Sequence, residues 1–415
     1  MRQVHARPVI NLEEDAFAAG IPFEIFAYLR REAPVYWYEW PHGRGYWCIT
    51  RYHDIVAILR DHETFTSEWG ANLEDWDRFQ AVCRRSMLET DPPRHTQLRK
   101  LVSAAFSPRA VSELEPLIRS IVEELVQRTF ARGGSFDALS DFASPLPIRV
   151  IARMLGVPEG DTPWLVEVTD RLMGNTDPEL SSISPYDETS NQYCLYPFRH
   201  PAALELFEYG HWLAEQRRQQ PSNDLVSKLV FAQIDGRPLT TAEFDNMFLL
   251  LVVAGNETTR QAIAHGLVAF ADFPDEARRL QANPVLLPSA VDEVLRWATP
   301  VLHFRRTARR DTEFEGHHIA AGDRVVVWFI SGNFDETVFA EPHQFLVDRS
   351  PNDHLTFGRA GIHFCLGTHL AKAELRIVLE MLLPYLTRYE LVERPTRIRS
   401  NFANGFKRLP VRVIG

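Results

Sequence analysis

The chain of 415 residues has few cysteines and no long hydrophobic segment. Its four cysteines, Cys48, Cys83, Cys194 and Cys365, are scattered and include no Cys-x-x-Cys pair, which argues against a cysteine zinc site or a disulfide framework. The longest apolar run lies near 247–255, far short of the ~20 residues needed to cross a bilayer. No apolar segment typical of a secretory signal follows the N-terminus. We therefore expect a cytoplasmic protein.

The chain also lacks a basic net charge and any segment with the composition of a linker. The 45 Lys and Arg are outnumbered by 55 Asp and Glu, which gives a formal charge of -10 and disfavours general binding of nucleic acid. The 27 prolines are spread out, and no internal repeat divides the sequence. An apolar fraction of 45%, with 26 Phe and 9 Trp, excludes a disordered chain or a coiled coil. We expect residues 1–415 to form a single domain.

Local patterns predict a mainly α protein with small β-sheets. A proline in the first turn predicts a short helix over 22–31. Two β-rich runs, 35–40 and 46–50, predict a hairpin. Helical patterns dominate from 52 to 383, and short strands interrupt them over 312–329.

One predicted helix is longer than the others. Thr240-x-x-Glu243 is a capping box that starts it, and apolar residues recur at helical spacing over 244–270. No proline follows until Pro274, so at 1.5 Å per residue the helix would be about 45–50 Å long. Because it is apolar nearly all round over 247–255, we expect it to run through the core.

The strongest chemical signal is Phe-Gly-Arg-Ala-Gly-Ile-His-Phe-Cys-Leu-Gly at 357–367. A lone cysteine is more often a small core residue, but here three glycines permit tight turns. They present Cys365 from a loop immediately before an amphipathic helix over 366–383. The N-terminus of that helix and nearby backbone N–H groups would stabilise a thiolate. Such a thiolate can serve as an axial haem ligand.

This motif resembles that of the cytochrome P450 family, in particular its soluble bacterial members, and the similarity extends from about His53 to the C-terminus. Phe357 stands eight residues before Cys365, one more than in the commonest form of the motif. The resemblance implies a cytochrome P450 fold with a long central helix and small β-sheets. It also implies haem b as the cofactor, Cys365 as the proximal iron ligand and a haem-thiolate monooxygenase activity that uses dioxygen.

A second motif, Ala-Gly-Asn-Glu-Thr-Thr at 254–259, lies midway along the long helix. Gly255 would open space, and the Thr258 hydroxyl can bond a preceding carbonyl and loosen the helix. Glu257 is a carboxylate in an apolar stretch, where burial is costly. The resemblance implies that Glu257 and Thr258 relay protons to the oxygen side of the haem, and that Ala254 contacts the cofactor.

Two further groups match family positions. Glu293-x-x-Arg296 and Arg349 are similar to the family's buried ion network, which implies a structural role. His95 and Arg99 lie one helical turn apart, a spacing suited to binding carboxylates. The resemblance implies that haem propionates are bound by four residues: His95, Arg99, Arg306 and His363.

Substrate-binding residues are the least defined part of the sequence. Family position implies walls from 69–79 and 172–196, and from the individual residues Leu250, Val301, Leu302, His303 and Phe402. These are mostly apolar or aromatic, which favours a hydrophobic substrate such as a terpenoid, steroid, branched lipid or small aromatic. Asn404-Gly405 predicts a hairpin turn beside Phe402.

No strand–GxGxxG–helix unit for a flavin or nicotinamide is present, so electrons would come from a separate protein. A basic patch near the cysteine would favour an acidic ferredoxin; its expected members are Arg84, Arg85, Arg94, Lys100, Arg359, Lys372 and Arg376. Two alternatives stay open. A peroxide-driven haem peroxygenase would not need the acid–alcohol pair, and a non-enzymatic haem-thiolate sensor would need an output domain.

Overall fold

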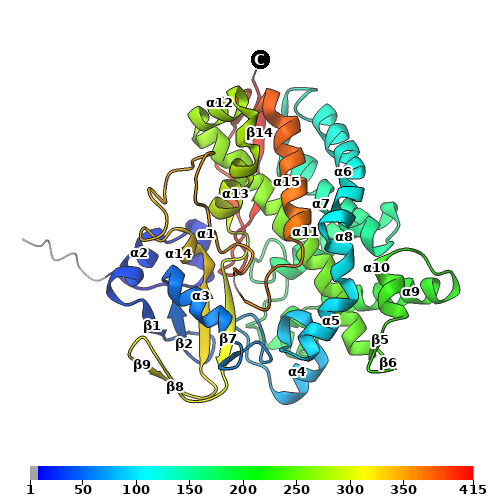
Figure 1. The fold of residues 1–415 in the computed structure, drawn as a ribbon, viewed down its shortest axis with the longest axis vertical. Helices are drawn as coiled ribbons and strands as arrows, with labels where there is room; N and C mark the ends of the chain where they lie inside the picture. Colours follow the sequence, from blue (N-terminus) through cyan, green and yellow to red (C-terminus); the bar gives the residue numbers. More distant parts are fainter. Residues whose placement is uncertain (1–7, 360, 415) are drawn as a thin grey trace, which may run out of the picture.

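The computed structural model describes residues 8–359 and 361–414. Helices occupy most of the molecule, and the strands of the largest sheet gather at the lower left of Figure 1. No helix in the described ranges is long and apolar enough to cross a membrane. The helices are α1 (Glu14–Ala19), α2 (Phe23–Glu32), α3 (Tyr52–Arg60), α4 (Arg78–Arg84), α5 (Arg94–Ser103), α6 (Pro108–Arg128), α7 (Pro145–Leu155), α8 (Thr162–Met173), α9 (Pro201–Gln219), α10 (Leu225–Val230), α11 (Thr241–Asp272), α12 (Pro274–Ala282), α13 (Leu287–Ala298), α14 (Phe329–Asn333) and α15 (Thr368–Leu382).

The strands form one five-stranded sheet, in the order β1-β2-β10-β7-β3, and several smaller sheets. This confirms the mainly α fold with small β-sheets. The strands are β1 (Val35–Tyr38), β2 (Tyr46–Ile49), β3 (Phe65–Thr66), β4 (Ser135–Asp137), β5 (Gln233–Ile234), β6 (Arg237–Pro238), β7 (His303–Ala308), β8 (Thr312–Phe314), β9 (His317–Ile319), β10 (Arg324–Trp328), β11 (Tyr389–Leu391), β12 (Thr396–Arg397), β13 (Phe406–Arg408) and β14 (Pro410–Val413).

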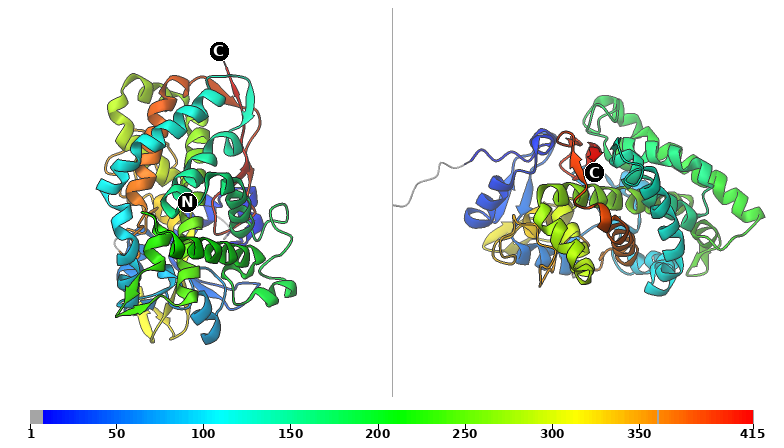
Figure 2. Two further views of the ribbon diagram at one scale, coloured as in Figure 1. Left: turned by 90° about the vertical axis from the view of Figure 1, so that its right-hand side faces the viewer. Right: turned by 90° about the horizontal axis from the view of Figure 1, so that it is seen from above.

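Helix α11 is the long helix that the capping box predicted. Its 32 residues span about 48 Å at 1.5 Å per residue. The Thr240 hydroxyl accepts from the Glu243 backbone N–H, and the Glu243 carboxylate accepts from the Thr240 N–H. Helices α7, α8, α9, α13 and α15 pack around α11, and Figure 2 shows it inside this shell. Helices from the N-terminal and C-terminal halves of the chain therefore both pack against α11.

The N-terminal predictions are also confirmed. β1 and β2 pair antiparallel from Val35 with Ile49 to Tyr38 with Tyr46. The sequence reading missed β7, which pairs antiparallel with β10. It missed this strand because Arg305 and Arg306 interrupt the apolar pattern, although both side chains are buried.

The predicted C-terminal hairpin is present, formed by β12 and β13, but Asn404-Gly405 is not its turn. A two-residue hairpin turn of this type needs positive φ at both residues, and neither Asn404 nor Gly405 has it. The two residues instead lead directly into β13, which pairs with β12 across a longer loop. Gly405 is needed for close packing, because a Cβ there would lie 2.7 Å from a methyl of Ile398 and 2.9 Å from Gln261.

Candidate active site

An internal cavity lies between the middle of α11 and the loop that precedes α15. Cys365 lies on one side of this inner cavity, and Leu250, Ala254 and Thr258 of α11 lie on the other. Apart from a few basic side chains at one end, the lining is mainly aliphatic and aromatic. It includes Met87, Leu88, Phe106, Leu251, Ala262, Leu295, Val301, Phe304, Phe329 and Leu370. A thiol thus faces an apolar space of the kind that binds an organic cofactor and a substrate.

Hydrogen bonds fix the loop that presents Cys365. The Cys365 N–H donates to Phe357 O at 2.9 Å, and the Thr368 hydroxyl donates to Cys365 O at 2.8 Å. Burial raises the pKa of the Cys365 thiol, while the Gly367 N–H, the Thr368 hydroxyl and the charge of Arg99 act to lower it. A cationic partner such as ferric iron would reverse the effect of burial, because it stabilises the thiolate directly.

Two glycines of this loop are required by its shape. Gly358 has a φ of +69°, in the left-handed region that side chains disfavour. Gly361 lies so close to α3 that a Cβ would be 2.7 Å from Leu59 O. The glycines therefore let the backbone turn tightly and bring the cysteine loop against its neighbour.

The four predicted propionate ligands converge on one end of the inner cavity: His95, Arg99, Arg306 and His363 all line it. His95 is 3% exposed, yet neither ring nitrogen has a hydrogen-bond partner in the described chain. Arg306 is buried, and among the described residues its side chain donates only to Arg305 O, at 2.8 Å. Burial lowers its pKa to about 10. Buried cations without anionic partners are unfavourable. A bound dianion, such as the two propionates of haem, would satisfy them, so these residues fit the cofactor.

Asp91 is a residue of this site that the sequence reading did not assign. His363 Nε2 lies 3.1 Å from Ser67 Oγ and 3.9 Å from Asp91 Oδ1. Although Asp91 is buried, hydrogen bonds from Thr66, Arg309 and the Ser67 N–H, together with the nearby His363, hold its pKa well below the usual range. Asp91 stands four residues before His95. That spacing does not indicate that the Asp91 carboxylate lies beside His363 of the cysteine loop.

The acid and alcohol of the second motif point in different directions. The Thr258 hydroxyl donates to Ala254 O at 3.0 Å, as predicted, and Thr258 lines the inner cavity. Glu257 is 2% exposed and faces away from the cavity. Its carboxylate binds Arg260 and accepts from Gln261 Nε2 at 2.8 Å. Adjacent residues of a helix are rotated by about 100°, and here the rotation turns Glu257 toward Arg260 while Thr258 lines the cavity.

Gly255 lines the inner cavity, as expected, and its missing side chain has a second role. A Cβ at this position would lie 2.8 Å from Ile151, on α7. The missing side chain therefore lets α11 approach α7 closely, and the space that it saves is filled by Ile151.

The expected ion network is assembled as predicted. Arg296 Nε donates to Glu293 Oε2 at 2.8 Å, and Arg349 Nε donates to the same oxygen at 3.0 Å. Glu293 and Arg296 are fully buried, and Arg296 also donates to Asn333 O and Pro342 O. Because each charge has several partners, the network can hold α13 to the segment that leads to the cysteine loop without leaving a buried charge unpaired.

The predicted substrate-pocket residues divide between two spaces. Leu250 and Val301 line the inner cavity, whereas His303 and Phe402 line a separate outer pocket. Leu302 lines neither, because it is fully buried in the core with Trp328. Val301 and Phe304 face the inner cavity, whereas His303 between them faces the outer pocket.

The two segments that were predicted to form substrate-pocket walls, 69–79 and 172–196, also contribute to the outer pocket. This pocket is lined by residues 72–75 and by several residues of the segment 173–199. The described lining of the inner cavity includes no residue of 69–79 or 172–196. The two spaces adjoin at Phe402 and Phe304, whose ring centroids are 5.9 Å apart.

The inner cavity thus combines a loop cysteine before a helix, an apolar chamber and a cationic end, which together define a haem-thiolate site. A sequence profile described as cytochrome P450 matches residues 9–286 and 282–396. The chain belongs to the cytochrome P450 family and is a haem-iron monooxygenase of that family.

Individual relatives agree with this assignment. The chain is 38% identical over 397 residues to the methyl-branched lipid omega-hydroxylase of Mycobacterium tuberculosis, covering 93% of this chain and 90% of the relative. It is 35% identical over 417 residues to the steroid C26-monooxygenase of Mycolicibacterium smegmatis, with 98% and 92% covered. A Mycobacterium marinum cytochrome P450 in complex with pseudoionone superimposes with a TM-score of 0.88 at 38% identity, over 99% of this chain and 100% of that one.

The cationic end of the cavity predicts the effect of a double substitution. His95→Ala with Arg99→Ala should lower the haem content of the purified protein, because each charge-assisted hydrogen bond contributes about 1.5–3 kcal/mol. The measurement is the ratio of the haem Soret absorbance to the protein absorbance. Lys100→Ala, an exposed position on the same helix, is the control and should retain full haem. Full haem in the double variant would exclude a role in binding the propionates.

Proposed function

We propose that this enzyme holds haem b on Cys365 and hydroxylates a hydrophobic small molecule at its apolar end. The observation that carries the proposal is the contrast between the two adjoining spaces. The outer pocket is rich in polar side chains, among them Asn72, Asn175, Asn191 and Asn401. The inner cavity beside Cys365 is lined on its α11 side by aliphatic side chains. An elongated substrate with one polar end would therefore place its apolar end next to the haem.

The names of the relatives support the same class of substrate. One relative is named for omega-hydroxylation of methyl-branched lipids, and another for oxidation of a steroid at C26. We therefore favour a branched lipid or a steroid side chain over a terpenoid or a small aromatic.

The chain's own residues would position the substrate and handle protons. When bound, the haem supplies the activation of dioxygen and the insertion of one oxygen atom into a C–H bond. Leu250, Ala254 and Val301 exclude water from the apolar end of the substrate. The Thr258 hydroxyl, whose proton is donated to Ala254 O, can accept a hydrogen bond from the cavity side and hold a proton donor there. We also propose that Glu257 is the acid that delivers the proton. Its ion pair with Arg260 must break before the proton can be transferred.

A panel of ligands tests the substrate class. Branched lipids and steroids with one polar end should shift the haem spin state on titration, and the product should be oxidised at the carbon farthest from the polar group. Leu250→Phe narrows the inner cavity and should weaken this binding about tenfold or more, because the added ring overpacks an enclosed site. Val82→Phe, on an exposed side chain, should leave binding unchanged. Oxidation beside the polar group would contradict the proposed orientation.

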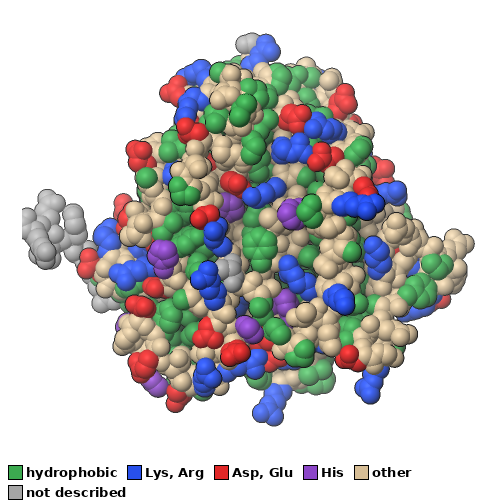
Figure 3. Space-filling model, viewed as in Figure 1, with side chains coloured by type: hydrophobic (Ala, Val, Ile, Leu, Met, Phe, Trp, Pro, Cys, Tyr) green, Lys and Arg blue, Asp and Glu red, His purple; other side chains and the backbone are tan. Residues whose placement is uncertain are grey.

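We further propose a ferredoxin-type electron donor that docks over the cysteine loop. Figure 3 views this side and shows Lys and Arg side chains spread over it, with Asp and Glu side chains among them. Lys100 and Phe364 are exposed, whereas Arg94, Lys372 and Arg376 form ion pairs with nearby carboxylates. Arg84 cannot contribute, because it is 2% exposed and donates to Glu74 at 2.6 Å.

Reversal of the charge at Lys100 tests this donor. Lys100→Glu should slow NADH-dependent turnover with an acidic ferredoxin and its reductase several-fold, because it removes attraction across the interface. Turnover driven by hydrogen peroxide bypasses the donor and should not change. Lys228→Glu, at an exposed position of α10, is the control. If peroxide supports turnover and ferredoxin does not, the enzyme is a peroxygenase; if neither does while ligands still bind, it is a sensor.

A further inference from the structure

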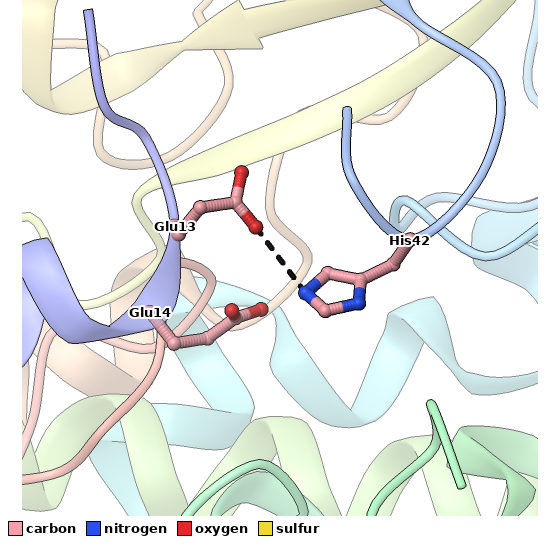
Figure 4. A group of neighbouring side chains, drawn as sticks. All are labelled: Glu13, Glu14 and His42. Atoms are coloured by element: carbon pink, nitrogen blue, oxygen red, sulfur yellow. Dashed lines mark ion pairs between the residues drawn. The ribbon is translucent and has the colours of Figure 1, made fainter. Parts of the chain in front are cut away.

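A cluster of two glutamates and a histidine lies outside the haem site, at the start of α1. Glu13 is the residue before this helix and Glu14 is its first residue, and His42 lies in the loop between β1 and β2. Figure 4 shows the three side chains converging. A carboxylate oxygen of each glutamate and an imidazole nitrogen lie within 4.8 Å of one another. Glu13 Oε2 and His42 Nε2 are 3.4 Å apart.

Each carboxylate of this cluster is held by a tyrosine through one oxygen only. The Tyr38 hydroxyl donates to Glu13 Oε1 at 2.6 Å, and the Tyr186 hydroxyl donates to Glu14 Oε1 at 2.5 Å. The Oε2 atoms of both glutamates are buried and accept no hydrogen bond from any described residue. Glu14 as a whole is only 1% exposed. The tyrosine therefore fixes the orientation of each carboxylate, while the second carboxylate oxygen has no hydrogen-bond donor among the described residues.

Two such carboxylates side by side are unfavourable without a positive partner. Burial and the neighbouring Glu14 raise the pKa of Glu13, and hydrogen bonding by Tyr38 and the charges of His42 and Arg399 oppose them. The group across from the carboxylates is His42, which is about one-third exposed and open to solvent. A cation between the three side chains would neutralise the repulsion and satisfy both free oxygens at once.

We propose that Glu13, Glu14 and His42 bind one divalent transition-metal ion, with Zn²⁺ as the best match. Imidazole nitrogen and carboxylate oxygen are both ligands of Zn²⁺, and water can take the fourth position. Bonds of about 2.0–2.2 Å in a tetrahedron require ligand atoms about 3.3–3.6 Å apart. Glu13 and His42 already meet this spacing. Rotation of the Glu14 side chain would bring its carboxylate oxygen to the same distance from the other two ligand atoms. The two tyrosines would orient the ligands from behind.

This site would join three segments that lie far apart in the sequence. The His42 ring stacks on Tyr186 with a centroid distance of 4.1 Å and an interplanar angle of 5°. Tyr186 belongs to the long segment between α8 and α9, and both residues line the outer pocket. A bound ion would therefore fix the N-terminal helix and one wall of the outer pocket together. The inference stands independently of the proposed substrate.

Zinc binding to the haem-loaded, full-length enzyme tests the proposal. Isothermal titration with ZnCl₂, followed by elemental analysis after dialysis, should show one zinc per chain in addition to the haem iron. Co²⁺ should bind in its place and give the visible absorption bands of a tetrahedral site. Glu14→Gln keeps the shape of the side chain and should weaken Zn²⁺ binding at least tenfold, as should His42→Ala. Tyr186→Phe should weaken it by about tenfold, because it removes only the orienting hydrogen bond.

The matched control is another histidine–glutamate pair at the same distance. His318 Nδ1 and Glu313 Oε1 are also 3.4 Å apart, but both side chains are exposed, so His318→Ala should leave Zn²⁺ binding unchanged. The carbon monoxide difference spectrum and circular dichroism establish that each variant is folded. Equal Zn²⁺ binding by wild type, Glu14→Gln and His42→Ala, or no binding by wild type, would overturn the proposal.

Discussion

Replacement of Cys365 by alanine is expected to abolish the thiolate spectrum of the haem protein and its monooxygenase activity. Cys365 is the one cysteine that faces the inner cavity, and its loop is shaped by Gly358, Gly361 and the hydrogen bond to Phe357. The reduced protein with carbon monoxide should show the red-shifted Soret band of thiolate ligation, and the Cys365→Ala variant should lack it. Product formation should fall below detection, because the thiolate supplies the electron density that favours O–O cleavage.

The other cysteines provide controls for this experiment. Cys48 is buried in the core around β2, and Cys83 and Cys194 are free and partly exposed. Alanine at Cys83 or Cys194, and serine or alanine at Cys48, should retain the red-shifted band. If that band persisted in Cys365→Ala, a different residue would have to be the iron ligand.

The second large effect is expected at Thr258. Its hydroxyl is fixed by Ala254 O at 3.0 Å on the cavity side of α11, where it can position a proton donor. Thr258→Ala should still consume NADH when donor proteins and substrate are present, but it should release hydrogen peroxide in place of most of the product. The measurement is product formed per NADH consumed, with peroxide assayed in parallel. Haem content should be unchanged.

Two variants separate the hydroxyl from its surroundings. Thr258→Ser keeps the hydroxyl and should retain most of the coupling between NADH and product. Glu257→Gln should slow NADH consumption while product per NADH stays near the wild-type value, because the acid acts on the rate of proton delivery. Unchanged coupling in Thr258→Ala would mean that water or a hydroxyl of the substrate performs the role we propose for this residue.

Local sequence determined the parts of the molecule that depend on short spacing. The capping box of Thr240 and Glu243 starts α11 because both groups lie within one turn. Glu293 and Arg296 pair because residues three apart share a helix face. The glycines around Cys365 fix a loop because φ preferences are a property of each residue. These features needed no knowledge of distant neighbours, and the family resemblance supplied the place of Arg349.

Only the tertiary structure decided whether each of two adjacent side chains faces the inner cavity, the outer pocket or the core. Glu257 turns toward Arg260 while Thr258 faces the cavity, since rotation along α11 is fixed by what packs on each side. Leu302 enters the core while Val301 lines the cavity, because the chain is extended there and the core lies on one face of the sheet. Sequence spacing gives such alternation but does not say which face is inward.

The tertiary structure also decided which distant residues meet. Arg84 was expected on the cysteine side, yet its guanidinium is buried against Glu74. Glu14, His42 and Tyr186 come from an N-terminal helix, a hairpin loop and a long connecting segment, and no motif links them. Contacts of this kind depend on how helices and sheets pack after they form, so a periodic pattern in the sequence carries no information about them.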